Sequence, residues 1–268
     1  MPEVKRRTHA KPAYRPKLAR RCGECHGNHL ENWLGSGHAQ SAKSKLYQHA
    51  RGTEDAGCDR CHAPLRAVAG SDKLVVEEGI NCEVCHGISA VRHGELGGTF
   101  DLSLTDNRKF GPVCDGNQHY FHKLGCAPLF EESKFCASCH SWTRTLANGK
   151  KLPVFTTFEE WQASGQVATC QDCHMQQERG SLATGWRNDR LISDHGFLAA
   201  SKFDASLTMN AQVEQVGGAG KPWVVRASVT NAYAAHAFPA GLPGKVLVLR
   251  IRALDKLGGE LARKEYQF

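Results

Sequence analysis

The chain has 268 residues, enough for one large domain or two small ones. Its formal net charge is +7, and it contains no run of about 18 apolar residues that could cross a bilayer. No apolar signal-peptide segment follows Met1. Residues 1–21 are instead basic and interrupted by prolines, which predicts an N-terminal arm without a fold of its own.

Twelve cysteines are many for an ordinary cytosolic enzyme, and their spacing indicates their role. Ten of them form five copies of C-x-x-C-H, the attachment signature of c-type haem. Two cysteines form thioethers to the haem vinyl groups, and the next histidine is the proximal iron ligand. We therefore expect five covalently bound c-type haems. The motifs comprise Cys22, Cys25 and His26; Cys58, Cys61 and His62; Cys82, Cys85 and His86; Cys136, Cys139 and His140; and Cys170, Cys173 and His174.

Two other uses of C-x-x-C pairs fit less well. A zinc ribbon has no need for a histidine directly after the second cysteine of every copy. A thioredoxin-like motif needs a surrounding βαβ pattern, which is missing from this sequence. Because haem attachment takes place outside the cytoplasm, we expect a periplasmic or extracellular protein.

The second axial face of each iron separates an electron carrier from an enzyme. With only three methionines in the chain, mostly bis-histidine, low-spin irons are expected. His9, His29 and His49 are expected on the surface. The candidate distal ligands are His38, His93, His119, His122, His195 and His236, with His119 and His122 as alternatives.

His38 lies in a segment that recurs later in the chain. ENWLGSGH, residues 31–38, is repeated as EEWQASGQ, residues 159–166. The tryptophan and the serine occur in both copies and are expected to pack and to cap, whereas Gln166 replaces His38 in the second. The histidine is therefore peculiar to one copy, as expected of a ligand.

The two remaining cysteines, Cys114 and Cys126, predict a disulfide in an oxidising compartment. Closing this loop would stabilise the chain by roughly 3 kcal/mol and stiffen the segment that carries His119 and His122. The alternative is two buried thiols and two exposed histidines.

The expected fold is mainly α with extensive loops, packed around five haems, plus a small C-terminal antiparallel β segment of sandwich-like type. Residues 22–204 would form the haem domain, whose apolar core is largely the haems themselves. Residues 205–268 alternate as strands, separated by the turns GAGKP and DKLGG. This segment would supply His236 as a distal ligand and is too short for a complete sandwich.

The motifs in combination resemble a known family. CGECHGNHLENWLGSGHA, GINCEVCHG, EEWQASGQVATCQDCHM and a final H-x-F-P-x-G turn are similar to multihaem cytochromes c related to the tetrahaem electron acceptor of hydroxylamine oxidoreductase. The resemblance covers roughly residues 20–250 and implies closely packed haems, with His38, His195 and His236 as distal ligands. Ala240 and Lys245 replace the threonine and arginine of that turn.

The favoured function is electron transfer along the five haems between a redox protein donor and an acceptor. The alternative is an oxidoreductase with one open haem iron that acts on a small nitrogen or sulfur compound. A third hypothesis is a subunit of a larger redox complex or filament. Each ferric haem adds a charge of about −1 through its propionates, so the basic balance does not favour a nucleic-acid partner.

Overall fold

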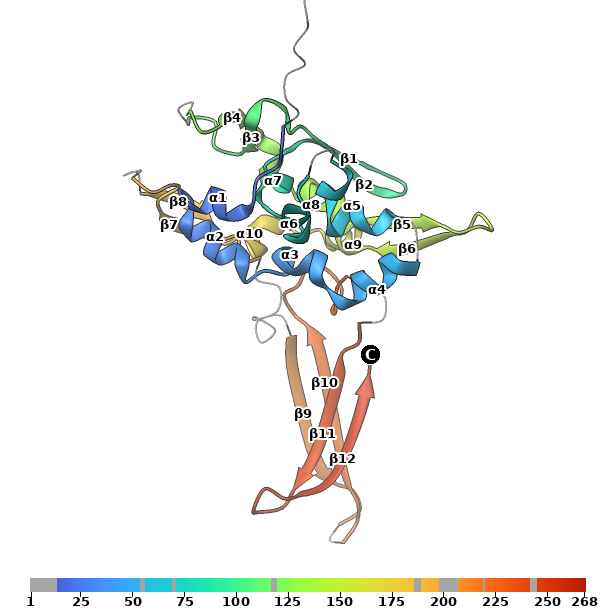
Figure 1. Ribbon diagram of the computed structural model, residues 1–268. Helices are drawn as coiled ribbons and strands as arrows, with labels where there is room; N and C mark the ends of the chain where they lie inside the picture. Colours follow the sequence, from blue (N-terminus) through green and yellow to red (C-terminus); the bar gives the residue numbers. More distant parts are fainter. Residues whose placement is uncertain are drawn as a thin grey trace, which may run out of the picture. The chain divides into compact units, whose positions relative to one another are not determined.

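The computed structural model describes residues 14–53, 56–68, 71–116, 120–185, 189–197, 207–218, 220–241 and 245–268 (Figure 1). Helices account for 32% of the chain and strands for 31%, so the prediction of a mainly α fold is wrong. The physical reason is that the segments between the motifs pair as short strands, while each motif makes only one or two helical turns.

The helices are short, and the longest in the described part of the chain has nine residues. No helix within the described ranges has the length and apolar character needed to cross a membrane. The helices are α1 (Ala19–Gly23), α2 (Gly27–Leu34), α3 (Gly37–Gln40), α4 (Lys45–Thr53), α5 (Asp59–His62), α6 (Lys73–Glu77), α7 (Cys82–Cys85), α8 (Ser133–His140), α9 (Thr157–Ser164) and α10 (Cys170–His174).

Short strands connect the motifs. A four-stranded sheet has the order β1 (Ile88–Gly94), β2 (Gly97–Leu102), β5 (Trp142–Thr145), β6 (Lys151–Phe155). Strands β3 (Arg108–Gly111) and β4 (Lys123–Cys126) pair in parallel, and β7 (Gln177–Gly180) and β8 (Arg190–Ser193) pair antiparallel. Glycine allows β2 to approach α8 closely: a Cβ on Gly98 would lie 2.0 Å from the carbonyl oxygen of Ala137.

The C-terminal residues form two antiparallel hairpins, β9 (Leu207–Gln215) with β10 (Trp223–Asn231), and β11 (Val248–Leu254) with β12 (Glu260–Gln267). The glycine-containing turns of the sequence lie between the strands of each hairpin. The observed backbone pairing is that of two separate two-stranded sheets, where the sequence suggested a sandwich-like segment.

The described residues fall into two compact units. Those of the first lie within the ranges 1–92, 99–135 and 169–198, and those of the second lie within the ranges 93–98, 136–168 and 199–268. The first unit contains four motifs, and the second contains the motif that ends at His140, together with the hairpins.

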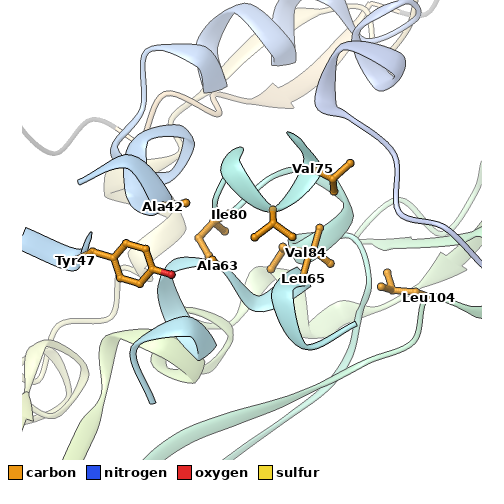
Figure 2. Close-up of a cluster of buried hydrophobic side chains, with 9 residues drawn as sticks. Ala42, Tyr47, Ala63, Leu65, Val75, Ile80, Val84 and Leu104 are labelled. Atoms are coloured by element: carbon orange, nitrogen blue, oxygen red, sulfur yellow. The ribbon is translucent and has the colours of Figure 1, made fainter. Parts of the chain in front are cut away.

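The main apolar cluster lies in the first unit and is small. Figure 2 shows its side chains, which come from α4, α6 and α7, from the turn after the second motif, and from the segments before α4, before α7 and after β2. Leu65 and Ala63 are fully buried there, and Cys58 and Cys85 of two motifs pack against the cluster. The attachment motifs are therefore built into this core. Its buried members are Ala42, Tyr47, Ala63, Leu65, Val75, Val76, Ile80, Val84 and Leu104.

Candidate haem-binding sites

All five C-x-x-C-H motifs form helical turns. They lie at the α1–α2 junction, in the turn that ends with α5, in and after α7, at the end of α8, and in α10. Residues three apart share a helix face, so each turn directs its two cysteines to the same side, with the histidine next in line. Local caps fix these turns: the Asn81 side chain accepts from two amides at the start of α7, and Thr169 and Asp172 form a capping box in α10.

Three motif histidines have the ring contact that is usual for a metal ligand. Nδ1 of His26 lies 2.5 Å from the carbonyl oxygen of Leu182, and Nδ1 of His86 lies 2.6 Å from that of Phe110. Nδ1 of His62 lies 3.3 Å from the carbonyl oxygen of Ser41. A carbonyl acceptor at Nδ1 fixes the tautomer whose Nε2 binds a metal. The residues present therefore fit covalently attached haem.

The last two motifs are more open. His140 is exposed and His174 is half-buried. The α10 turn is nevertheless anchored, because Ser133 Oγ accepts from the amide of Cys170 at 3.0 Å.

The first and third motifs lie side by side. The thiols of Cys22 and Cys82 lie close enough to shift each other's pKa, and α1 contacts α7. Groups attached at these two cysteines would therefore be neighbours.

Two predicted distal ligands lie close to motif histidines. The rings of His86 and His195 have centroids 6.3 Å apart and an interplanar angle of 20°. The rings of His26 and His122 have centroids 6.4 Å apart and an angle of 37°. A histidine nitrogen lies about 2 Å from a bound transition metal, so two imidazoles on one metal have centroids about 6 Å apart. Both pairs have a separation that suits an iron between them.

The loop that bears His122 is closed covalently. Cys114 and Cys126 form a disulfide with Cα atoms 4.7 Å apart. His122 is half-buried and directly precedes β4, whereas His119 lies outside the described residues.

His29, which sequence reasoning assigned to the surface, is half-buried among these histidines. Its ring centroid lies 4.7 Å from that of His195 and 6.0 Å from that of His26. Burial, with the charges of His26 and His86, lowers the pKa of His29 to about 4. Burial likewise lowers the pKa of His195 to about 3. Both rings are thus neutral at pH 7, the form that binds metals. The sequence held one signal for the burial of His29: it follows His26 by three residues and lies on α2, so both rings lie on the same side.

His38 packs edge-on against Phe197, with ring centroids 4.3 Å apart. The repeated tryptophan and serine have the expected structural roles around it. Trp33 Nε1 donates to the carbonyl oxygen of Ile80 at 2.8 Å, and Ser36 Oγ accepts from the amide of Ala39. The carbonyl oxygen of His38 accepts from Ser41 Oγ at 2.9 Å.

In the second copy of the repeat, the tryptophan and serine side chains form hydrogen bonds within residues 161–168. Trp161 Nε1 donates to the carbonyl oxygen of Ala168, and Ser164 Oγ donates to that of Trp161.

His93 has a different environment from the one expected of a distal ligand. Its Nε2 lies 3.0 Å from Ser141 Oγ and 3.1 Å from Glu159 Oε1, and its ring packs on Phe158. The nitrogen that would bind an iron is therefore directed at two polar side chains next to the fourth motif.

His236 lies in a turn that several hydrogen bonds hold in place. Its carbonyl oxygen accepts from Asn231 Nδ2 at 2.8 Å, and its Nδ1 lies 3.0 Å from the carbonyl oxygen of Ala237. The amide of Ala237 donates to Glu160 Oε2 of α9 at 2.8 Å. Ala240 and Lys245 are the two residues that depart from the family pattern. They contact each other, because Lys245 donates to the carbonyl oxygen of Ala240.

Two segments of the chain match family models. Residues 21–87 match the family described as cytochrome c554 and c-prime, and residues 124–208 match the N-terminal region of the NapC/NirT cytochrome c family. Searches of curated proteins and of solved structures gave no match. These families carry covalently bound c-type haem and are typically exported. With its attachment motifs, the chain is a multihaem c-type cytochrome that functions in electron transfer.

Proposed function

We propose that the chain binds five c-type haems, one at each motif, and conducts electrons between two redox proteins. The observation that carries this proposal is the separation within two imidazole pairs. The ring centroids of His26 and His122 lie 6.4 Å apart, and those of His86 and His195 lie 6.3 Å apart. Two imidazoles on one iron leave no open position for a substrate, which favours conduction over catalysis.

A bound haem supplies a reversible one-electron couple at each motif. The chain's own residues do the rest. The carbonyl oxygens of Leu182 and Phe110 hold the proximal rings by Nδ1, which raises the basicity of Nε2 and favours the ferric state. The proximity of Cys22 and Cys82, on the contacting helices α1 and α7, supports a short transfer step between the first and third haems.

We also propose a periplasmic or extracellular location. Haem attachment by this motif takes place outside the cytoplasm, and the disulfide between Cys114 and Cys126 is of the kind that persists in oxidising compartments.

Pyridine haemochrome quantitation combined with a reductive titration tests the proposal. Five haems and five electrons per chain are expected. Fewer than five haems in fully matured protein would contradict it. Replacing Cys58 and Cys61 with serine should lower both counts to four, which calibrates the measurement.

A second candidate function is an oxidoreductase whose haem iron at the fourth motif is open to a small nitrogen or sulfur compound. It is favoured by the hydrogen bonds of His93 Nε2 to Ser141 and Glu159, which direct this candidate ligand away from an iron. Ferric protein should then show a high-spin EPR signal that nitrite or hydroxylamine shifts. An unchanged spectrum at saturating concentrations of both would eliminate this candidate.

A further inference from the structure

The residue after the first cysteine lies inside the attachment turn, and in three motifs its side chain binds another part of the chain. In the second motif, Asp59 accepts from Tyr47 at 2.5 Å and from Arg51 at 2.9 Å. In the fifth, Gln171 Nε2 donates to the carbonyl oxygens of Phe130 and Glu132. The first and fourth motifs have Gly23 and Ala137 at this position, which offer no polar side chain.

The third motif has the most deeply buried of these anchors. The Glu83 side chain is 0% exposed, and Lys109 Nζ donates to its Oε2 at 3.0 Å. Tyr14 donates its hydroxyl to the same carboxylate at 2.7 Å. Burial, reinforced by Glu83, raises the pKa of Tyr14 well above its usual range, so the hydroxyl remains a donor. A buried carboxylate requires such partners, because an unpaired charge there is strongly destabilising.

This ion pair is one of three links between β3 and the segment of α7 and His86. The other two join Phe110 to His86, and in one of them the amide of Phe110 donates to the carbonyl oxygen of His86 at 2.8 Å. Glu83 belongs to α7, and His86 directly follows it; Lys109 and Phe110 are adjacent in β3. The carbonyl oxygen of Phe110 lies 2.6 Å from Nδ1 of His86. A displacement of β3 at Lys109 would therefore also displace the acceptor that holds the His86 ring.

We propose that Glu83 and Lys109 are positioning residues for His86, because their ion pair holds β3 where the Phe110 carbonyl meets the imidazole. The inference rests on the proposed function, since it concerns the iron that His86 would bind. A carbonyl at Nδ1 makes the opposite nitrogen a stronger donor and lowers the potential of the bound iron. The ion pair would thus set the potential and the ligand geometry of one haem among five.

Two single variants, Glu83→Gln and Lys109→Met, test this in the full-length, haem-loaded protein by EPR-monitored potentiometry. If the residues act by positioning, both variants raise the potential of the same haem and change its low-spin g values, because either change breaks the link to β3. If they act only through their charges, the two potentials shift in opposite directions and the g values stay constant. That second pattern, or no shift in either variant, would overturn the inference.

A charge-neutral variant keeps the test usable if a single variant fails to fold. The double variant Glu83→Gln/Lys109→Met removes both charges of the ion pair and should show the same altered haem. A folded double variant with five normal haem signals would overturn the inference. Asp101→Asn is the matched control, because it breaks an exposed ion pair with Arg92 between β1 and β2 and should change no haem.

The two proposals fail in different ways. Unshifted variants of a protein that carries five haems would refute the positioning role alone. A missing haem at the third motif of the unmodified protein would refute the proposed function as well.

Discussion

The motifs around α7 and the C-terminal hairpins are held together by different forces. Around α7, buried side chains such as Leu65 and Val84 pack against motif cysteines, and an ion pair with a fully buried carboxylate joins helix to strand. In β9–β12, no described side chain is buried, and Trp223 and Leu261 are largely exposed. Two-stranded hairpins rely on backbone hydrogen bonds and are only marginally stable alone. The second and third motifs therefore lie where the side-chain packing is concentrated.

The strongest test of this contrast removes a motif from each unit. Replacing Cys82 and Cys85 with serine should remove one haem and lower the Tm markedly, because Cys85 packs on the main apolar cluster. Replacing Cys136 and Cys139 should also remove one haem but lower the Tm less, since neither packs on that cluster. Intact-mass spectrometry and thermal unfolding measure both effects, and equal Tm losses would contradict the contrast.

The next largest difference is expected between the stability costs of replacing one leucine in each region. Leu65→Ala empties a fully buried position and should cost about 2–5 kcal/mol of unfolding free energy. Leu261→Ala changes a side chain that is 70% exposed and should stay within about 0.5 kcal/mol. Denaturant unfolding followed by circular dichroism gives both values. A similar cost at the two positions would show that the hairpin is covered in solution.

The disulfide should contribute about as much as a core leucine. Replacing Cys114 and Cys126 with alanine should cost roughly 3 kcal/mol, because the cross-link no longer restricts the unfolded chain. The same variant should loosen the loop of His122 and weaken one low-spin EPR signal. Full stability combined with an unchanged spectrum would argue that the loop is fixed by β3–β4 pairing alone.

The smallest difference in stability is expected between variants of Trp33 and Trp161, the tryptophans of the two repeat copies. Trp33→Phe removes a buried indole donor and leaves the Ile80 carbonyl oxygen without it, at a cost of about 1–3 kcal/mol. Trp161→Phe acts at a more exposed site and should cost less than about 1 kcal/mol. Urea titration of the two variants checks the order, and a larger loss at Trp161 would reverse our interpretation of the repeat.

Sequence reasoning worked where the signal is local. The five motifs require no tertiary information, and the alternating apolar pattern around GAGKP and DKLGG locates strands β9, β10 and β11. It failed for the strands between motifs, because segments of four residues such as β3 and β4 are too short to show a period. Their parallel pairing depends on residues far apart in the chain.

The candidate site was only partly predictable for a related reason. A histidine's burial depends on which segments fold over it, so nothing in the composition distinguishes His29 from His49, which is exposed on α4. Likewise, the identity of the residue after the first cysteine of a motif does not by itself indicate what that side chain contacts. Glu83 became informative only once Lys109 and Tyr14 were located beside it.

The proposed ligand pairs are tested most directly by the EPR spectrum of ferric protein carrying His122→Ala or His195→Ala, with His49→Ala as the exposed control. We expect each of the first two variants to convert one low-spin iron to high spin, while the control matches the unmodified protein. Unchanged low-spin signals in both variants would contradict the proposed pairing of these histidines with His26 and His86.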